Sequence, residues 1–162
     1  MIFLEWCVLW LMINMILAVT TSYIIYNTAL SFLGLYMPFK RTVFPILLFT
    51  VLLYISKVVF KAPPIVHTII MVNICVLIIY LFNRVNFILN LCASLSIVII
   101  IIIGNLLIVC PILNKLGISL ANINFNTLDW IILNIGELSI PTIFLIVSRT
   151  NKLSLIKQIL NK

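Results

Sequence analysis

The stretch "FILNLCASLSIVIIIIIGNLLIVC", residues 87–110, decides the fold of this protein. It carries no charged side chain and is longer than the roughly 20 apolar residues that an α-helix needs to cross the hydrocarbon core of a bilayer. A water-soluble domain would have to bury such a run on every side. The stretch therefore predicts a membrane-spanning helix.

The composition of the whole chain leads to the same conclusion. Of its 162 residues, 65% are hydrophobic and 8% are charged, whereas a soluble domain carries about 25% charged residues. A chain of this length has too little interior to hide so much apolar surface, so lipid must cover the rest. The lysine and arginine residues that give the net charge of +7 lie in short segments between apolar runs and in the tail. This distribution favours contact with anionic headgroups over nucleic-acid binding.

Four further apolar runs lie on either side of residues 87–110. They are separated by "GLYMPFKR" (34–41), by "KAPP" (61–64), by "NRVN" (83–86) and by a more polar segment that we expect Pro111 to open. The predicted fold is therefore all-α: a polytopic membrane helix bundle of about five transmembrane helices over residues 6–33, 43–60, 65–82, 87–110 and 130–148.

Lysine and arginine predict the orientation of this bundle. We expect residues 1–148 to form the bundle and residues 149–162 to form a basic amphipathic tail, because Leu153, Ile156 and Leu160 recur at helical spacing among lysines. Basic segments stay on the cytoplasmic side, so the C-terminus is predicted to be inside and the N-terminus outside. The abundance of Ile, Asn and Lys is typical of low-GC bacteria, which indicates a bacterial cytoplasmic membrane.

Four polar side chains, one from each of four spans, are predicted to lie in the outer half of the bundle. They form a candidate ligand-binding pocket that opens to the outside and consists of Lys57, His67, Asn105 and Glu137. Ionisable residues at membrane depth are costly and usually face the bundle interior or a cavity. Glu137 is therefore the central member of this hypothesis.

Each of the four also has a purely structural interpretation. Lys57 can extend its ammonium group to the interface, and His67 can mark the first turn of the helix that follows two prolines. Asn105 can simply bond to a neighbouring helix, and Glu137 can reach interfacial water. For His67 and Asn105 the structural interpretation is favoured, and for Glu137 both stay open.

The sequence gives no support to an enzyme. Cys7, Cys75, Cys92 and Cys110 form no CxxC pair, and the one histidine and three carboxylates are scattered. The four glycines are too far apart for a phosphate-binding loop. We therefore expect no catalytic residue, no metal and no cofactor.

Four motifs resemble the N-terminal multi-span sensor region of Gram-positive GHKL-type histidine kinases. They are "LGLYMPFKR" (33–41), "KAPPIVHTII" (61–70), "NKLGISL" (114–120) and "NTLDWIILNIGELSIP" (126–141), and the most specific element is the Pro-x-x-His-Thr of residues 64–68. Asn105 departs from the acidic residue common in such kinases. The sequence also has no phosphoacceptor histidine after the spans and no glycine-rich ATP lid, so the resemblance implies a sensing module without kinase activity.

Three functions follow as alternatives. The first is a signalling or sensing membrane component that reads an extracellular or lipidic ligand, or docks a membrane partner, with residues 149–162 contacting a signalling protein and a homodimer as a further option. The second is the substrate-binding component of a small transporter. The third, a pore-forming chain, lacks the polar stripe that its spans would need. Membrane lipids are partners in all three.

Overall fold

The computed structural model describes residues 2–56, 64–117 and 128–151, and in these residues every regular element is helical. The elements are α1 (Ile2–Phe32), α2 (Phe39–Tyr54), α3 (Pro64–Asn83), α4 (Phe87–Gly104), the π-helix η2 (Asn105–Val109), α5 (Cys110–Leu116) and α6 (Leu128–Asn151). The predicted all-α fold is therefore confirmed. Three helical segments of the described chain are long and apolar enough to cross a membrane: Leu9–Phe32, Val66–Asn83 and Phe87–Leu116.

Local sequence signals explain where these helices begin and end. Gly34 ends α1 with a φ of 70°, a conformation that glycine adopts without steric cost, and Pro38 precedes α2. The side chain of Asn86 accepts a hydrogen bond from the backbone N–H of Ile88 at 2.9 Å and so caps α4. Gly117, with a φ of 69°, ends α5.

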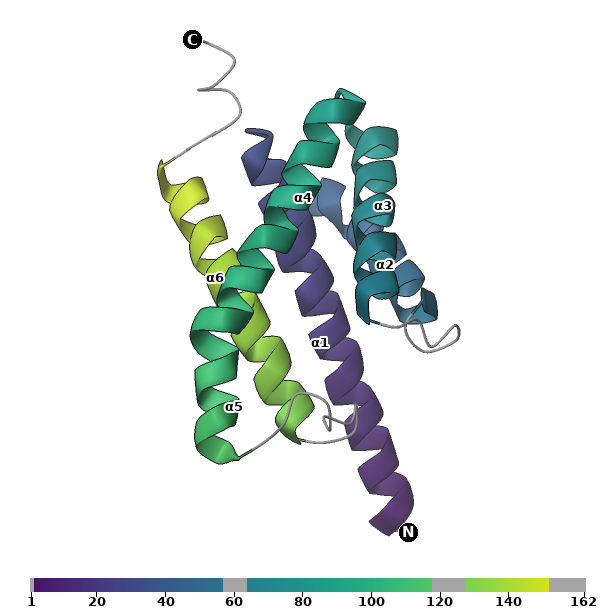
Figure 1. Cartoon of the computed structure of the whole chain (residues 1–162). Coiled ribbons are helices and arrows are strands. Elements are labelled where there is room, and N and C mark those ends of the chain that lie inside the picture. The colour runs from purple at the N-terminus through teal and green to yellow at the C-terminus, as the bar shows by residue number, and fades with distance from the viewer. Residues whose placement is uncertain (1, 57–63, 118–127, 152–162) are drawn as a thin grey trace.

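Helix α1 lies at the centre of the bundle (Figure 1). Helix α2 packs on one side of its C-terminal half, and α3 packs on α2. Helix α6 lies on the other side of α1, and α4 crosses α1 and contacts both α3 and α6. Successive helical rods run in opposite directions, with α4, η2 and α5 forming one continuous rod over Phe87–Leu116. The start of α1 and the end of α6 therefore lie at opposite ends of the bundle.

The core surrounds the second half of α1. Tyr26 and Leu30 of α1 pack with Phe49 of α2, Ile79 of α3 and Ile97 of α4, and all five are at most 1% exposed. Two amides join helices across this core. Asn90 donates to the carbonyl of Val76 at 2.6 Å, and Asn83 donates to the Tyr26 hydroxyl at 3.0 Å.

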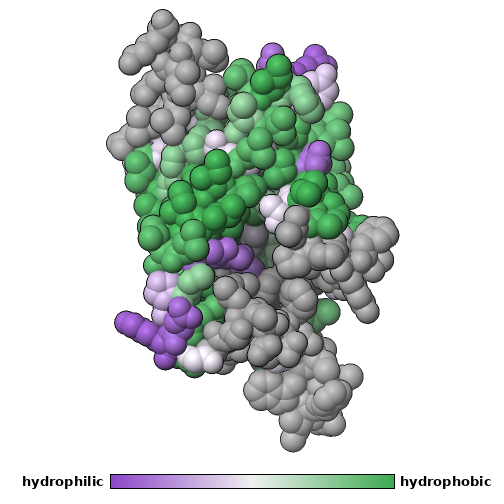
Figure 2. Space-filling model, in the orientation of Figure 1, coloured by the Kyte–Doolittle hydropathy of each residue, from purple (hydrophilic) through white to green (hydrophobic). Residues whose placement is uncertain are grey.

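The outer surface is mostly apolar (Figure 2). Leucine, isoleucine, valine and phenylalanine side chains stay exposed on every long helix, including the N-terminal half of α1, where Met12, Met15 and Ile16 are more than half exposed. So much exposed apolar surface is characteristic of a chain whose solvent is lipid.

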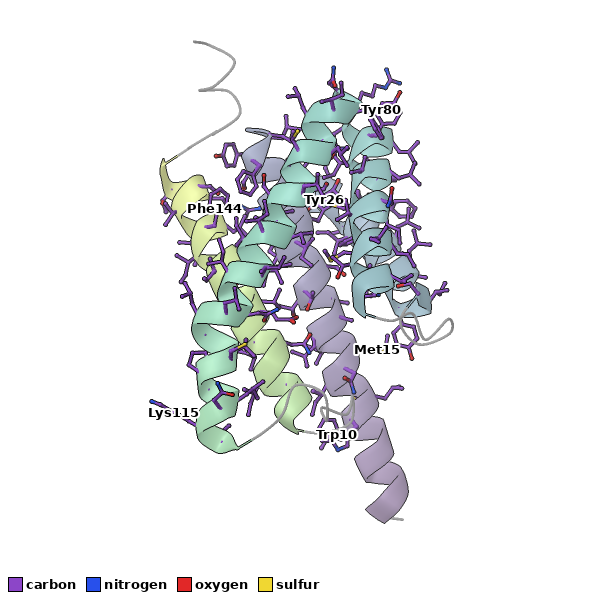
Figure 3. All side chains as sticks on the ribbon, viewed as in Figure 1. Trp10, Met15, Tyr26, Tyr80, Lys115 and Phe144 are labelled. Atoms are coloured by element: carbon purple, nitrogen blue, oxygen red, sulfur yellow. The ribbon has the colours of Figure 1, made fainter. Side chains whose placement is uncertain are left out.

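The described basic residues are unevenly distributed between the two ends of the bundle. Lys40, Arg41, Arg84 and Arg149 lie at the end where α6 terminates, whereas Lys115 lies at the other end, as does Trp10 (Figure 3). Lys57 and the predicted amphipathic tail from residue 152 onward lie outside the described residues.

Several helix boundaries differ from the predicted ones. The fourth rod does not end at Cys110 but continues to Leu116, so the expectation that Pro111 opens a loop is wrong. Proline is accommodated there because it stands in the first turn of α5, directly after the π-helix, where the main-chain bonding is already irregular. Helix α2 begins at Phe39 rather than residue 43, and α6 extends past residue 148 to Asn151.

Candidate functional site

The structure brings together two of the four predicted site residues. The Asn105 side-chain amide donates a hydrogen bond to Oε1 of Glu137 at 3.2 Å, and both side chains are half-buried. Glu137 follows the first residue of α6 by nine positions, so it lies about 14 Å along the axis from that end of the helix and about 21 Å from the other. The pair therefore lies well inside the bundle and not at the end of a helix.

Asn105 occupies a special position in its helix, because it opens the π-helix η2. The backbone N–H of Cys110 donates to the carbonyl of Asn105, five residues earlier, instead of the usual four. Pro111 follows directly and has no N–H to offer to the carbonyl of Leu107, so the regular ladder is already interrupted here. Single-turn π segments occur frequently at functional sites.

Two glycines lie where the helices that carry this pair cross, and one of them is required for the close approach. A Cβ on Gly104 would lie 3.5 Å from the main-chain oxygen of Glu137 and 3.7 Å from that of Gly136, which is ordinary van der Waals contact. A Cβ on Gly136 would collide with Cγ2 of Val109. The side of α6 next to Glu137 therefore packs directly on η2, and this packing fixes the carboxyl group beside Asn105.

A proline in α6 changes the main-chain bonding at this crossing. Pro141 has no N–H, so it cannot make the regular helical bond to the carbonyl of Glu137 four residues earlier, and that oxygen faces Gly104. Nearby hydroxyl groups bond to the backbone of the same helix segment. Ser139 donates to the carbonyl of Gly136 at 2.5 Å, and Thr142 donates to that of Leu138 at 2.6 Å.

One acceptor of the pair has no hydrogen-bond partner. Oδ1 of Asn105 is buried, and none of the described residues donates to it. On the neighbouring helix α1, Thr28 donates to the carbonyl of Pro141, four residues after Glu137, at 3.5 Å. A buried oxygen without a donor costs free energy, so the site favours a ligand or partner that donates hydrogen bonds.

His67 is in a different part of the bundle. Its Nδ1 is 2.9 Å from the Ser56 hydroxyl, which is buried at the C-terminal end of α2, so the two residues join the ends of the α2–α3 hairpin. In Figure 1, α3 and α6 lie on opposite sides of α1, which separates the helix of His67 from that of Glu137. This placement agrees with the structural interpretation of His67 at the start of a helix.

A second polar cluster, which the sequence did not indicate, joins α1 and α6 at the Arg149 end. Arg149 donates to Oδ1 of Asn27 at 2.7 Å and to the Tyr23 hydroxyl at 3.4 Å. Tyr36 donates to the carbonyl of Ser148 at 2.9 Å, and partial burial raises the pKa of this phenol above its ordinary value while Arg149 opposes the shift. Tyr36 therefore stays a hydrogen-bond donor at neutral pH.

The two clusters share helix α6. Between Glu137 and Arg149, two residues of α6 contact α1: the rings of Phe144 and Phe32 stack with their centroids 4.4 Å apart, and the carbonyl of Pro141 accepts from Thr28. The contacts between α1 and α6 thus extend from Pro141 to Arg149, where the predicted tail begins.

The described cysteines are free thiols and belong to no metal-binding group. Cys75 is buried, Cys92 is exposed and Cys110 is half-buried, and all three are free. Within the described residues no group of three histidine, cysteine or acidic side chains gathers that could hold a metal ion.

No protein-family model, no curated protein and no solved structure matches this chain.

Proposed function

We propose that this protein is a sensing or docking component of a bacterial cytoplasmic membrane. In this proposal the bundle crosses the membrane five times, with the N-terminus outside and the C-terminus inside. The concentration of Lys40, Arg41, Arg84 and Arg149 at one end supports this orientation, because basic residues are retained on the cytoplasmic side.

The observation that carries the proposal is the hydrogen-bonded pair of Asn105 and Glu137 at the π-helix. A carboxyl group and an amide with an unused buried oxygen are costly inside a membrane unless they have a use. Their acceptor-rich character suits an amphipathic ligand, or a partner helix, that presents N–H or O–H groups. With the orientation above, the pair lies nearer to the outer face than to the inner one.

In this proposal, the contacts between α1 and α6 transmit ligand binding to the C-terminal tail. A ligand that changes how α6 sits against η2 would act on a helix that is tied to α1 at Phe144, Ser148 and Arg149. Residues 149–162 follow directly, and in this proposal they contact a signalling partner on the cytoplasmic side.

Photo-crosslinking in native membranes tests the proposal. A photoreactive amino acid at Leu106 or Ile135, exposed neighbours of the pair, should capture a defined amphipathic compound or membrane protein. The adduct should disappear in the Glu137→Gln variant, which keeps the size of the side chain and removes its negative charge. The same probe at Ile99, exposed on α4 away from the pair, is the control. If the probes at Leu106 and Ile135 capture only lipid, the proposal is contradicted.

A second candidate, a substrate-binding subunit of a transporter, is favoured by one specific feature. The fourth rod contains the π-helix η2 and α6 contains Pro141, and both irregularities lie beside a polar pair that this proposal places at membrane depth. Interrupted helices near the membrane midplane are typical of transport sites. Glu137-dependent uptake of a solute into proteoliposomes, together with a co-purifying ATPase, would favour transport over sensing.

A further inference from the structure

The outward face of α3 carries an amide in the middle of an apolar surface. Asn73 is exposed and lies nine residues from the first residue of α3, which places it about 14 Å from one end of the helix and about 15 Å from the other. Ile69, Leu77 and Tyr80 on the same face are each at least half exposed. In the proposed membrane-spanning orientation, this amide therefore faces the centre of the hydrocarbon.

The intrachain contacts satisfy Asn73 only in part. Its amide nitrogen donates to the carbonyl of Ile69 at 2.8 Å, and this is the one hydrogen bond that the described residues provide for it. Oδ1 and the second N–H stay available. Half-buried hydroxyl residues differ, because Thr50 and Ser96 each donate their single O–H to the backbone of their own helix. In lipid, an amide with unsatisfied hydrogen-bonding groups is stabilised by a hydrogen bond to another helix.

The residues around Asn73 have the spacing of a helix–helix seam. Val66, Ile70, Asn73, Leu77 and Tyr80 follow one another at alternating intervals of four and three residues, which is the a/d pattern of a coiled coil. Val66, Leu77 and Tyr80 are 44–54% exposed and Ile70 is half-buried, so no described helix covers most of this seam. Asn73 takes a d position in this pattern, and an amide in such a seam can form a hydrogen bond to the neighbouring helix in a membrane.

We propose that α3 forms a parallel homodimer with α3 of a second copy of this chain, held in register by reciprocal hydrogen bonds between the two Asn73 amides. Two arguments identify the occupant. All copies insert in the same orientation, so a two-fold axis along the membrane normal brings the same face of α3 together in parallel. An amide both donates and accepts, so Asn73 complements its own copy, whereas a foreign helix would need a matching polar group at the same depth.

Sedimentation equilibrium of the full chain in density-matched detergent micelles tests the association. The wild-type chain is expected to be dimeric, and Asn73→Leu should weaken the dimer about tenfold, the effect of losing a pair of amide bonds in a membrane. Leu77→Ala should also weaken it. Leu95→Ala, which truncates an exposed leucine on α4 outside the seam, is the matched control and should leave the dissociation constant unchanged. Glu137→Gln should not affect it, which separates this inference from the proposed function.

Disulfide cross-linking in vesicles of phosphatidylcholine and phosphatidylglycerol provides an independent measurement. With the four native cysteines replaced by alanine, Leu77→Cys should form a covalent dimer on oxidation, and Leu95→Cys should not. A wild-type chain that stays monomeric at every detergent-to-protein ratio overturns the inference, even if another membrane protein is captured at this face. An unchanged dimer in Asn73→Leu, or preferential cross-linking at position 95, overturns it as well.

Discussion

Gly136 of α6 lies so close to Val109 of the π-helix that a Cβ on the glycine would collide with the valine side chain. The same crossing contains Gly104 of α4, where a Cβ would have room, at 3.5 Å from the nearest oxygen. Both glycines stand next to the polar pair, at Asn105 and at Glu137. The positions of the Asn105 amide and the Glu137 carboxyl group therefore depend on a close helix contact that requires glycine at position 136 but not at position 104.

This difference predicts opposite effects of alanine at the two glycines. Gly136→Ala should destabilise the bundle by about 1–3 kcal/mol, because the added methyl group overpacks the contact with Val109. Gly104→Ala should be neutral or stabilising by up to about 1 kcal/mol, since alanine has the better helix propensity and the site has space. Unfolding in mixed micelles by SDS titration measures both. Equal losses at the two positions would show that the helices do not approach more closely at Gly136 than at Gly104.

A double-mutant cycle tests the hydrogen bond between the two polar residues. The single variants Asn105→Ala and Glu137→Ala, and the double variant, should show a coupling energy of about 0.6–1.7 kcal/mol, the range for interhelical bonds in membranes. Thr142→Ala combined with Asn105→Ala is the control, because Thr142 bonds to its own helix backbone. Additive effects in the first cycle would contradict the pairing.

Pro111 is predicted to maintain the π-helix. Pro111→Ala restores an N–H that can donate to the carbonyl of Leu107, which favours a regular α-helical turn and rotates Asn105 relative to Glu137. The variant should therefore be at least as stable as the wild type but should lose the coupling between Asn105 and Glu137. The same double-mutant cycle, repeated in the Pro111→Ala background, measures this. A coupling energy that persists there would show that the π-helix has another cause.

Arg149 is predicted to fasten the end of α6 to α1. Arg149→Ala removes the bonds to Asn27 and Tyr23 and should cost about 1–2 kcal/mol, because a charged donor is lost from a buried amide oxygen. Lysine at this position should recover only part of the loss, since it lacks the planar guanidinium group. Hydrogen exchange of the last two turns of α6 should increase. Lys40→Ala, which removes an exposed cation at the same end, is the control and should leave this exchange unchanged.

The sequence by itself determined the all-helical fold and the approximate limits of its helices. A backbone in hydrocarbon has to satisfy its N–H and C=O groups within the same segment, so long apolar runs such as residues 87–110 can only be helical. Gly34, Pro38 and Asn86 mark ends that the structure also has. The sequence did not predict that the helix continues through Pro111. A proline can mark the end of one helix or the first turn of the next, and the sequence does not distinguish the two.

Only the tertiary structure decided which polar groups meet. Asn105 and Glu137 could be recognised as unusual from the sequence, but their contact could not, nor could those of His67 with Ser56 and of Arg149 with Asn27. The physical reason is that lipid and neighbouring helices are almost equally apolar, so the pattern of leucine and isoleucine does not reveal which face of a helix turns inward. The close contact of Gly136 with Val109 determines which faces of α6 and η2 meet, and it depends on residues from two helices at once.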